Sequence, residues 1–209
     1  MEAVVRRLKG VVRRSDDGFS LVEVIVALAL LAVITMPASL LFIQSMQTSK
    51  MDEQRQSAAM IANETLEVVR SRNPTTLMNG RKATDVDTQW KNPGPINLAN
   101  TNEPTLVDTG GTTVIPATAQ TSTVGGVKYT VNTIIGTCYA PTGTPNSITT
   151  SCDKTNAAGT SPMYRVAVSV SWSAGRGYSC PTKTSGLCSV VTDTLIDPAL
   201  GDPQFNNNT

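Results

Sequence analysis

The hydrophobic pattern divides this chain of 209 residues into three parts. An apolar run extends from residue 19 to residue 43 and contains a single charged residue, Glu23. Residues 44–70 contain neither Gly nor Pro, and their apolar positions recur near helical spacing. From about residue 75 onward, short alternating apolar and polar segments separate stretches rich in Thr, Asn, Gly, Pro and Ser. This order predicts an α+β protein, a long helix followed by a β-rich domain.

The apolar run is long enough to cross a membrane. As a helix it would span roughly 37 Å at about 1.5 Å per residue, against a hydrocarbon core of about 30 Å. Positively charged residues stay on the cytoplasmic side of such a segment, so the rest of the chain is expected outside the cytoplasm. The basic residues that precede the run are Arg6, Arg7, Lys9, Arg13 and Arg14.

The helix is predicted to continue to residue 73 and to become amphipathic. Pro74 ends it, because proline disfavours helical geometry in the residue before it. Pro37 predicts a kink or a locally melted turn, because it removes one helix hydrogen bond and crowds the preceding turn. The apolar face comprises Met51, Ala58, Ile61, Ala62, Thr65 and Val69. The polar face comprises Asp52, Glu53, Arg55, Asn63, Glu64 and Glu67.

Three segments with a period of two predict β-strands at residues 127–135, 164–172 and 189–196. Residues 105–107 and 112–115 are predicted to form an edge hairpin. Residues 92–126 and 136–162 otherwise predict loops and turns. A small antiparallel sheet packed on the apolar face of the helix accounts for these patterns. In the clearest strand Tyr164, Val166, Val168, Val170 and Trp172 face one way, and Arg165, Ala167, Ser169 and Ser171 face the other.

Four cysteines lie in this β-rich part: Cys138, Cys152, Cys180 and Cys188. An even number of cysteines outside the cytoplasm predicts disulfides, and four cysteines allow three pairings. Proximity in sequence favours Cys138 with Cys152 and Cys180 with Cys188. Zinc is the alternative, but the spacings are not those of a zinc ribbon and the chain contains no histidine.

Composition argues against several classes of function. Without histidine, neither a Ser-His-Asp nor a Cys-His arrangement can form. No glycine-rich phosphate loop is present, so we expect neither an enzyme nor a cofactor nor a metal site. Asp85-Val86-Asp87 resembles part of a calcium loop, whose glycine and final glutamate do not follow. Beyond residue 18 the chain holds twelve basic and thirteen acidic residues, without the clustered basic face typical of nucleic-acid binding.

Glu23 requires a cation. A charge near the middle of a membrane segment costs about 2.5–3.5 kcal/mol, less near its end, and marks a functional site. Residues 19–43 contain no Lys, Arg or His to pair with it. Cleavage between Gly18 and Phe19 would create an amine four residues before Glu23, on the same helix face.

This combination of a basic leader, Gly18, Phe19, Glu23 and an apolar helix resembles the N-terminus of a type IV prepilin. The resemblance implies cleavage after Gly18 by a prepilin peptidase, N-methylation of Phe19, and pairing of Glu23 with the Phe19 amine of a neighbouring subunit. It implies a leader at residues 1–18, a long pilin helix at residues 19–73 and an extracytoplasmic head at residues 74–209. In this family a proline at a depth similar to that of Pro37 accompanies a helix that loosens on assembly.

A secretory signal peptide is the alternative interpretation, with a small-residue cleavage site at Ala38-Ser39. The apolar run is longer than the usual signal core of about 7–15 residues, and the acidic pair Asp16-Asp17 is unusual in a basic n-region. These two features favour the prepilin interpretation.

Residues 56–70 and the Tyr164–Trp172 strand resemble minor pilins and minor pseudopilins. The first hypothesis is therefore a minor pilin, held in the cytoplasmic membrane by one helix before it enters an extracellular filament. Its implied partners are the peptidase and methyltransferase, other pilin subunits and the inner-membrane assembly platform. A minor pseudopilin of a type II secretion system is the first alternative. A surface adhesin or binding module anchored by one helix is the second.

Overall fold

A computed structural model describes residues 18–105, 111–141, 152–173, 180, 183–184 and 187–198. The chain divides into two compact units, Met1–Gln47 and Thr48–Thr209, and each is described by itself. The boundary falls within the long helix, so the second half of that helix belongs to the head.

The long helix α1 extends from Leu21 to Arg70. It is continuous through Pro37, so the locally melted turn expected there is not found. A kink at Pro37 stays a prediction. Asn73 begins the 3-10 helix Pro74–Thr76, and its side-chain oxygen accepts a hydrogen bond from the Thr75 N–H at 3.1 Å. The helix α1 therefore ends three residues before the predicted end at residue 73, and the Asn73-Pro74 pair begins the next element.

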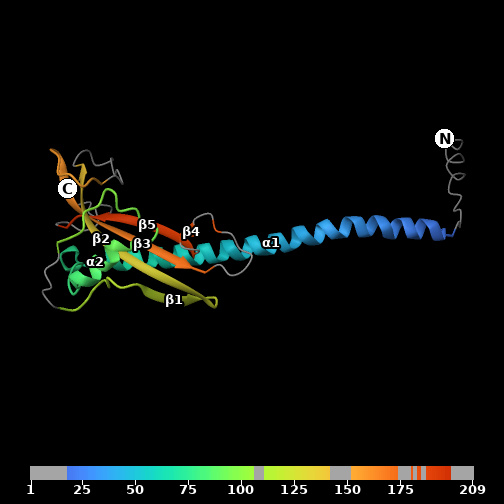
Figure 1. Cartoon of the computed structure of the whole chain (residues 1–209), viewed down its shortest axis with the longest axis horizontal. Coiled ribbons are helices and arrows are strands. Elements are labelled where there is room, and N and C mark those ends of the chain that lie inside the picture. Colours follow the sequence, from blue (N-terminus) through green and yellow to red (C-terminus); the bar gives the residue numbers. More distant parts are fainter. Residues whose placement is uncertain are drawn as a thin grey trace, which may run out of the picture. The chain divides into compact units, whose positions relative to one another are not determined.

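The head contains a five-stranded antiparallel sheet in the order β1-β2-β3-β5-β4 (Figure 1). A two-residue turn, Gly125-Gly126, joins β1 to β2, and both glycines have positive φ (58° and 77°). Such a turn follows the twist of the strands and favours glycine. The strands are β1 (Gln120–Val124), β2 (Val127–Pro141), β3 (Thr160–Trp172), β4 (Lys183–Thr184) and β5 (Leu187–Ile196).

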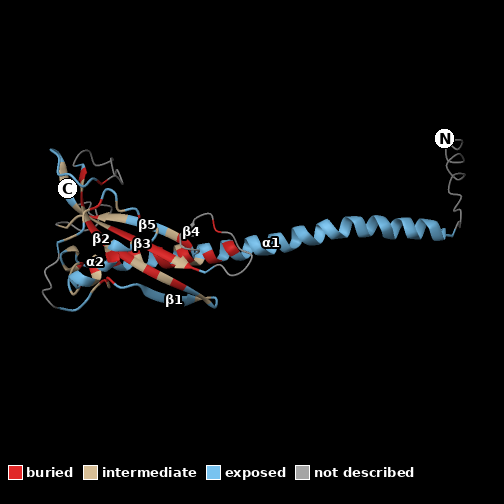
Figure 2. Cartoon of the chain, viewed as in Figure 1, coloured by how far each residue is buried: buried red, intermediate tan, exposed pale blue. Residues whose placement is uncertain are grey.

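One face of the sheet packs on the second half of α1, where buried residues of the helix and strands form one core (Figure 2). The predicted alternation of β3 is confirmed, because Val166, Val168, Val170 and Trp172 are buried in this core. The predicted helix face is also largely correct. Thr65 is half-buried, whereas the helix residues buried in the structure are Met51, Gln54, Ala58, Ile61, Ala62, Leu66 and Val69.

The opposite face of the sheet is also partly covered, which the sequence did not predict. A second cluster contains Ile96, Ile134 and Ala167, with Trp90 packed against it. Gly136 permits this covering, because a Cβ at this position would lie 2.3 Å from Thr101 Cγ2 and 2.8 Å from a Trp90 ring carbon. A Cβ does not fit at these distances, so glycine allows the segment around residue 101 to lie directly on β2.

Several predicted loops contain regular structure. The expected loop at residues 136–162 is wrong at both ends, because β2 and β3 remain paired from Gly136–Arg165 to Pro141–Thr160. The expected arm at residues 112–115 is not a strand, and most of its predicted partner lies outside the described residues. The edge strand is β1 instead. Asp85 and Asp87 lie on the helix α2 (Ala83–Lys91), which contradicts a calcium loop.

A polar contact joins the helix to the sheet inside the core. The Trp172 Nε1–H donates a hydrogen bond to Gln54 Oε1 at 3.1 Å, and the Tyr129 hydroxyl donates to the Gln54 carbonyl at 3.4 Å. The Tyr129 and Trp172 rings lie 5.8 Å apart at an interplanar angle of 49°. This contact sets the position of α1 along β2 and β3, because a buried indole N–H requires its acceptor.

We expect Gln54→Ala to destabilise the head by about 1–3 kcal/mol, because the buried indole N–H of Trp172 would lose its acceptor. Gln56→Ala is the matched control, since Gln56 is exposed on the same helix. Urea unfolding of the full chain in detergent, followed by tryptophan fluorescence, measures the difference. Equal midpoints for the two variants would contradict the proposed role of Gln54.

Candidate functional site

The Gly18-Phe19 bond precedes α1 in an exposed, non-helical segment. Gly18, Phe19 and Ser20 lie outside regular structure, and Phe19 is 85% exposed. A Cβ at Gly18 would have no heavy atom within 4 Å. The described part of the chain therefore gives no steric reason for glycine at position 18.

Ser20 begins the helix. Its hydroxyl oxygen accepts a hydrogen bond from the Val22 N–H at 3.3 Å, and its carbonyl accepts one from the Glu23 N–H at 2.9 Å. Side-chain oxygens of serine satisfy the unpaired N–H groups at a helix start in this way. Glu23 consequently lies in the first turn, where the helix dipole favours a negative charge.

Glu23 has no cationic partner among the residues that the structure describes. Every residue from 18 to 50 is exposed. The helix satisfies the length and composition criteria for a membrane span, although a signal sequence would satisfy them too. An acid in an apolar helix, with no cation among the described residues near it, is a candidate site for a charge interaction.

The hydroxyl groups of the apolar segment are satisfied by its own backbone. Ser39 Oγ donates to the Thr35 carbonyl at 2.8 Å, and Thr35 Oγ1 donates to the Ala32 carbonyl at 3.2 Å. This pattern lets serine and threonine enter an apolar environment without an unpaired donor. Both hydrogen bonds lie beside Pro37 in the sequence.

The head contains both predicted disulfides, Cys138–Cys152 and Cys180–Cys188. Both pairings follow the order favoured by proximity in sequence. The sulfur atoms are therefore not free to bind zinc in this structure.

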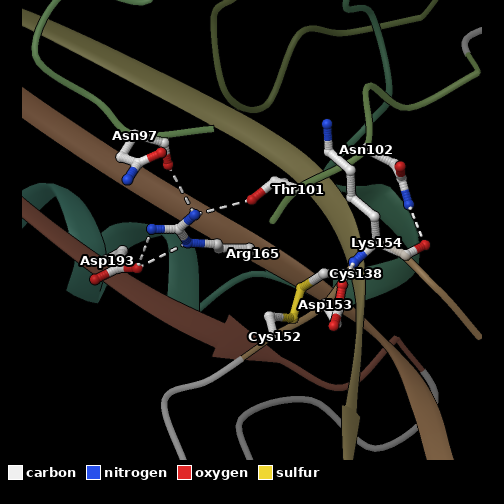
Figure 3. The surroundings of a disulfide bond; sticks show 9 residues. All are labelled: Asn97, Thr101, Asn102, Cys138, Cys152, Asp153, Lys154, Arg165 and Asp193. Atoms are coloured by element: carbon white, nitrogen blue, oxygen red, sulfur yellow. Dashed lines mark hydrogen bonds and ion pairs between the residues drawn. A yellow bond between two sulfur atoms is a disulfide. The ribbon is translucent and has the colours of Figure 1, made fainter. Parts of the chain in front are cut away.

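The Cys138–Cys152 disulfide lies where three segments meet (Figure 3). The backbones of Asn102 and Thr137 exchange hydrogen bonds of 2.7 and 2.9 Å, and those of Tyr139 and Asp153 exchange bonds of 2.8 and 3.0 Å. The disulfide and these two pairs of backbone hydrogen bonds attach Asn102, Cys152 and Asp153 to β2.

Arg165 links the same region to the outer face of the sheet (Figure 3). Its Nε and Nη2 both donate to Asp193 Oδ2 at 2.8 Å. Its Nη1 donates to the Asn97 carbonyl and to Thr101 Oγ1, each at 2.9 Å. One guanidinium therefore joins β3, β5 and the segment at residues 97–101, which is a structural role.

A buried arginine that the sequence did not reveal joins α2 to the sheet. Arg81 is 2% exposed, and it donates to Gln89 Oε1 on α2 at 2.9 Å and to the Thr133 carbonyl on β2 at 3.4 Å. It also donates to the carbonyls of Ile115 and Pro116 at 3.0 and 3.3 Å. Burial lowers the pKa of Arg81 to about 10, well below its ordinary value. Its acceptors among the described residues are all neutral oxygens, so this arginine stabilises the region through hydrogen bonds. Residue spacing alone does not indicate such a contact.

The described residues contain no group of three or more His, Cys, Asp or Glu side chains that could hold a metal ion. The predicted site residues instead form two sets. Gly18, Phe19, Glu23 and Pro37 lie in the N-terminal unit, and the four cysteines lie in the head. The candidate residues for processing and association therefore lie in the N-terminal unit.

Comparison with known proteins agrees with this location. A family model described as the prokaryotic N-terminal methylation motif matches residues 13–39, which include Gly18, Phe19, Glu23 and Pro37. No curated protein and no solved structure matches the chain. The motif and the long apolar helix show a type IV pilin-like protein.

We expect loss of the Cys138–Cys152 disulfide in a Cys138→Ser/Cys152→Ser variant to destabilise the head by about 3 kcal/mol, the chain-entropy value for a loop of about 15 residues. Limited proteolysis should then cut sooner near residues 97–102 and 153–154, because these segments are attached at the same place. The matched control is Cys180→Ser/Cys188→Ser, which should leave those cleavage rates nearly unchanged. Identical fragment patterns from the two variants would refute this local effect.

Proposed function

We propose that this type IV pilin-like chain is a minor structural subunit of a type IV pilus-like filament. The observation that carries the proposal is the methylation motif at residues 13–39, whose Gly18-Phe19 junction is exposed and precedes the helix. Function then comes from assembly through the N-terminal helix, and catalysis is not required.

In this proposal a prepilin peptidase cuts between Gly18 and Phe19, and a methyltransferase methylates the new Phe19 amine. Support comes from Ser20, which begins the helix just after the junction, so that the bond lies in exposed backbone outside the helix. A protease needs such backbone, because a helical peptide bond is already hydrogen-bonded and enclosed by side chains.

The next step pairs Glu23 with the Phe19 amine of a neighbouring subunit. An unpaired carboxylate in an apolar setting is costly, and a cation from the neighbour would remove that cost only in one axial register. The pair would therefore act as a register device between subunits, with the assembly platform of the inner membrane presenting each new chain.

The apolar surface of α1 supports the same scheme. The large apolar side chains from Leu21 to Met46 are exposed, several of them by more than 60%. Before assembly a membrane would cover this surface, and the helices of other subunits would cover it in a filament. An apolar surface of this extent is otherwise unfavourable in water.

A minor pseudopilin of a type II secretion system is the second candidate, supported by the same N-terminal motif. An anchored adhesin is disfavoured, because Glu23 would then have no partner. Cysteines placed singly in residues 24–34 distinguish assembly from an isolated anchor. Assembled subunits should give an ordered ladder of crosslinked oligomers, and an isolated anchor should not.

The test of the proposal is the intact mass and N-terminal peptide of the protein from sheared surface material. We expect a chain that begins at N-methylated Phe19. A chain that begins near Ala38, or one that retains Met1, would overturn the proposal.

We expect Gly18→Phe to block cleavage without loss of thermal stability, because a Cβ at this position has no heavy atom of the described chain within 4 Å. Mass spectrometry of membrane fractions should find only the uncut precursor, with a yield similar to that of the wild type. A substitution of the nearby Ser15 to Ala serves as the control, since it changes the leader without changing the cleaved bond. Mature mass in the Gly18 variant would refute the assigned cleavage site.

We expect Glu23→Ala and Glu23→Val to be cut normally but to enter sheared filaments at least tenfold less than the wild type, because one missing ion pair of about 1.4 kcal/mol changes an equilibrium tenfold. Glu23→Asp, which retains the charge, should recover part of the incorporation. The ratio of sheared to membrane-bound protein measures the effect. Wild-type ratios for the Ala and Val variants would disprove the register role.

A further inference from the structure

A groove lies between α1 and the edge strand β1 within the head. Ile61, Glu64 and Val68 line it from α1, residues 120–122 line it from β1, and Val131 lines it from β2. Its volume is about 300 Å³. That value is at the lower end of the range for small-molecule pockets, about 300–1,000 Å³, so the groove suits protein side chains better than a large cofactor.

The backbone of β1 has an unused hydrogen-bonding edge beside this groove. Val124 and Val127 flank a two-residue hairpin turn and form a hydrogen-bonded pair. Along an antiparallel ladder, hydrogen-bonded and non-hydrogen-bonded pairs alternate. The N–H and C=O groups of Thr121 and Thr123 therefore point away from β2. No backbone bond outside the ladder involves these two residues in the described part of the chain. This edge can therefore accept another strand.

The edge also lacks the features that usually prevent strand addition. Natural proteins block exposed edges with lysine, proline or a bulge. The β1 strand, Gln120–Val124, contains no charged residue and no proline, and its register with β2 is regular. An approaching strand meets no charge on this edge.

Glu64 supplies a negative charge at the groove. Its carboxylate has no ion-pair partner among the residues described by the structure. One helical turn away on either side lie the exposed apolar residues Met60 (59% exposed) and Val68 (43% exposed). A carboxylate between apolar side chains favours a ligand with a basic group and apolar neighbours.

We infer that this groove binds an extended segment of a partner protein by strand addition to β1. The segment donates and accepts backbone hydrogen bonds at Thr121 and Thr123. Because alternate side chains of a strand face the same side, its apolar side chains enter the groove and one basic side chain contacts Glu64. The inference concerns the head alone and does not depend on cleavage or methylation at the N-terminus.

The β1 strand of a second copy of this chain does not meet these requirements. That strand carries no basic residue, so edge-to-edge pairing of two copies would leave both Glu64 carboxylates without a cation. The partner is therefore a different segment, with alternating apolar residues and a central Lys or Arg.

The test uses the full chain in detergent micelles and a fluorescent, N-acetylated peptide of sequence TVTRTVT. In a strand its two valines and its arginine share one face. The matched control peptide is TVTETVT. We expect about tenfold weaker binding of the control by fluorescence anisotropy, because attraction to Glu64 becomes repulsion. Glu64→Gln should weaken binding of the arginine peptide about two- to fivefold, the range for an exposed ion pair, and should largely remove the difference between the peptides.

A second pair of variants tests the edge itself. Thr121→Pro removes the outward N–H and leaves the hydrogen bonds between β1 and β2 intact, as edge strands tolerate. It should reduce binding more than tenfold, whereas Thr121→Val, which retains the N–H, should bind as the wild type does. Undetectable binding of the arginine peptide, equal binding of both peptides, or full binding by a folded Thr121→Pro variant would overturn the inference. Glu64 is exposed, so its variant tests the inference even if the proline variant unfolds.

Discussion

The head depends on the contact between the buried face of α1 and one face of the sheet. A sheet of this size exposes a row of apolar side chains and is stable only when another element covers that row. The second half of α1 provides the cover, and the bond from Trp172 to Gln54 sets how the two elements align. The same contact explains the groove, because α1 packs on the central strands and leaves a gap beside the edge strand β1.

One continuous helix serves two physical environments. Its first half is apolar on all sides and exposed, which suits lipid or the helices of other subunits. Its second half is amphipathic and belongs to the head. The hydroxyl groups of Thr35 and Ser39 donate hydrogen bonds to the helix backbone. Glu23, by contrast, carries the single charge in the apolar segment at residues 19–43. That contrast is the reason why we propose Glu23 as the site of a charge interaction between subunits.

The outer face of the sheet is organised by polar contacts. Arg165 and Arg81 attach loop and helix segments through several hydrogen bonds each, and the Cys138–Cys152 disulfide attaches a third segment. A head with so many loop residues gains rigidity from such links. The hydrogen bonds restrict loop movement in the folded head, and the disulfide also reduces the conformational entropy of the unfolded chain. The hydrogen bonds of Arg165 and Arg81 therefore add stability where the second apolar cluster, Ile96, Ile134 and Ala167, buries little surface.

The sequence by itself determined the long helix, its change from apolar to amphipathic, the three main strands and the N-terminal motif, and it favoured the disulfide pairs that the structure contains. These features follow from local spacing: periods of 3.6 and 2, the position of Gly18 before Phe19, and short distances between cysteines. Only the tertiary structure decided the length of β2 and β3, the helix α2, the role of Arg81 and the groove beside β1. Each of these depends on contacts between residues far apart in the chain, and Thr-, Gly- and Pro-rich segments acquire strand or loop structure only when a neighbouring strand supplies their hydrogen bonds.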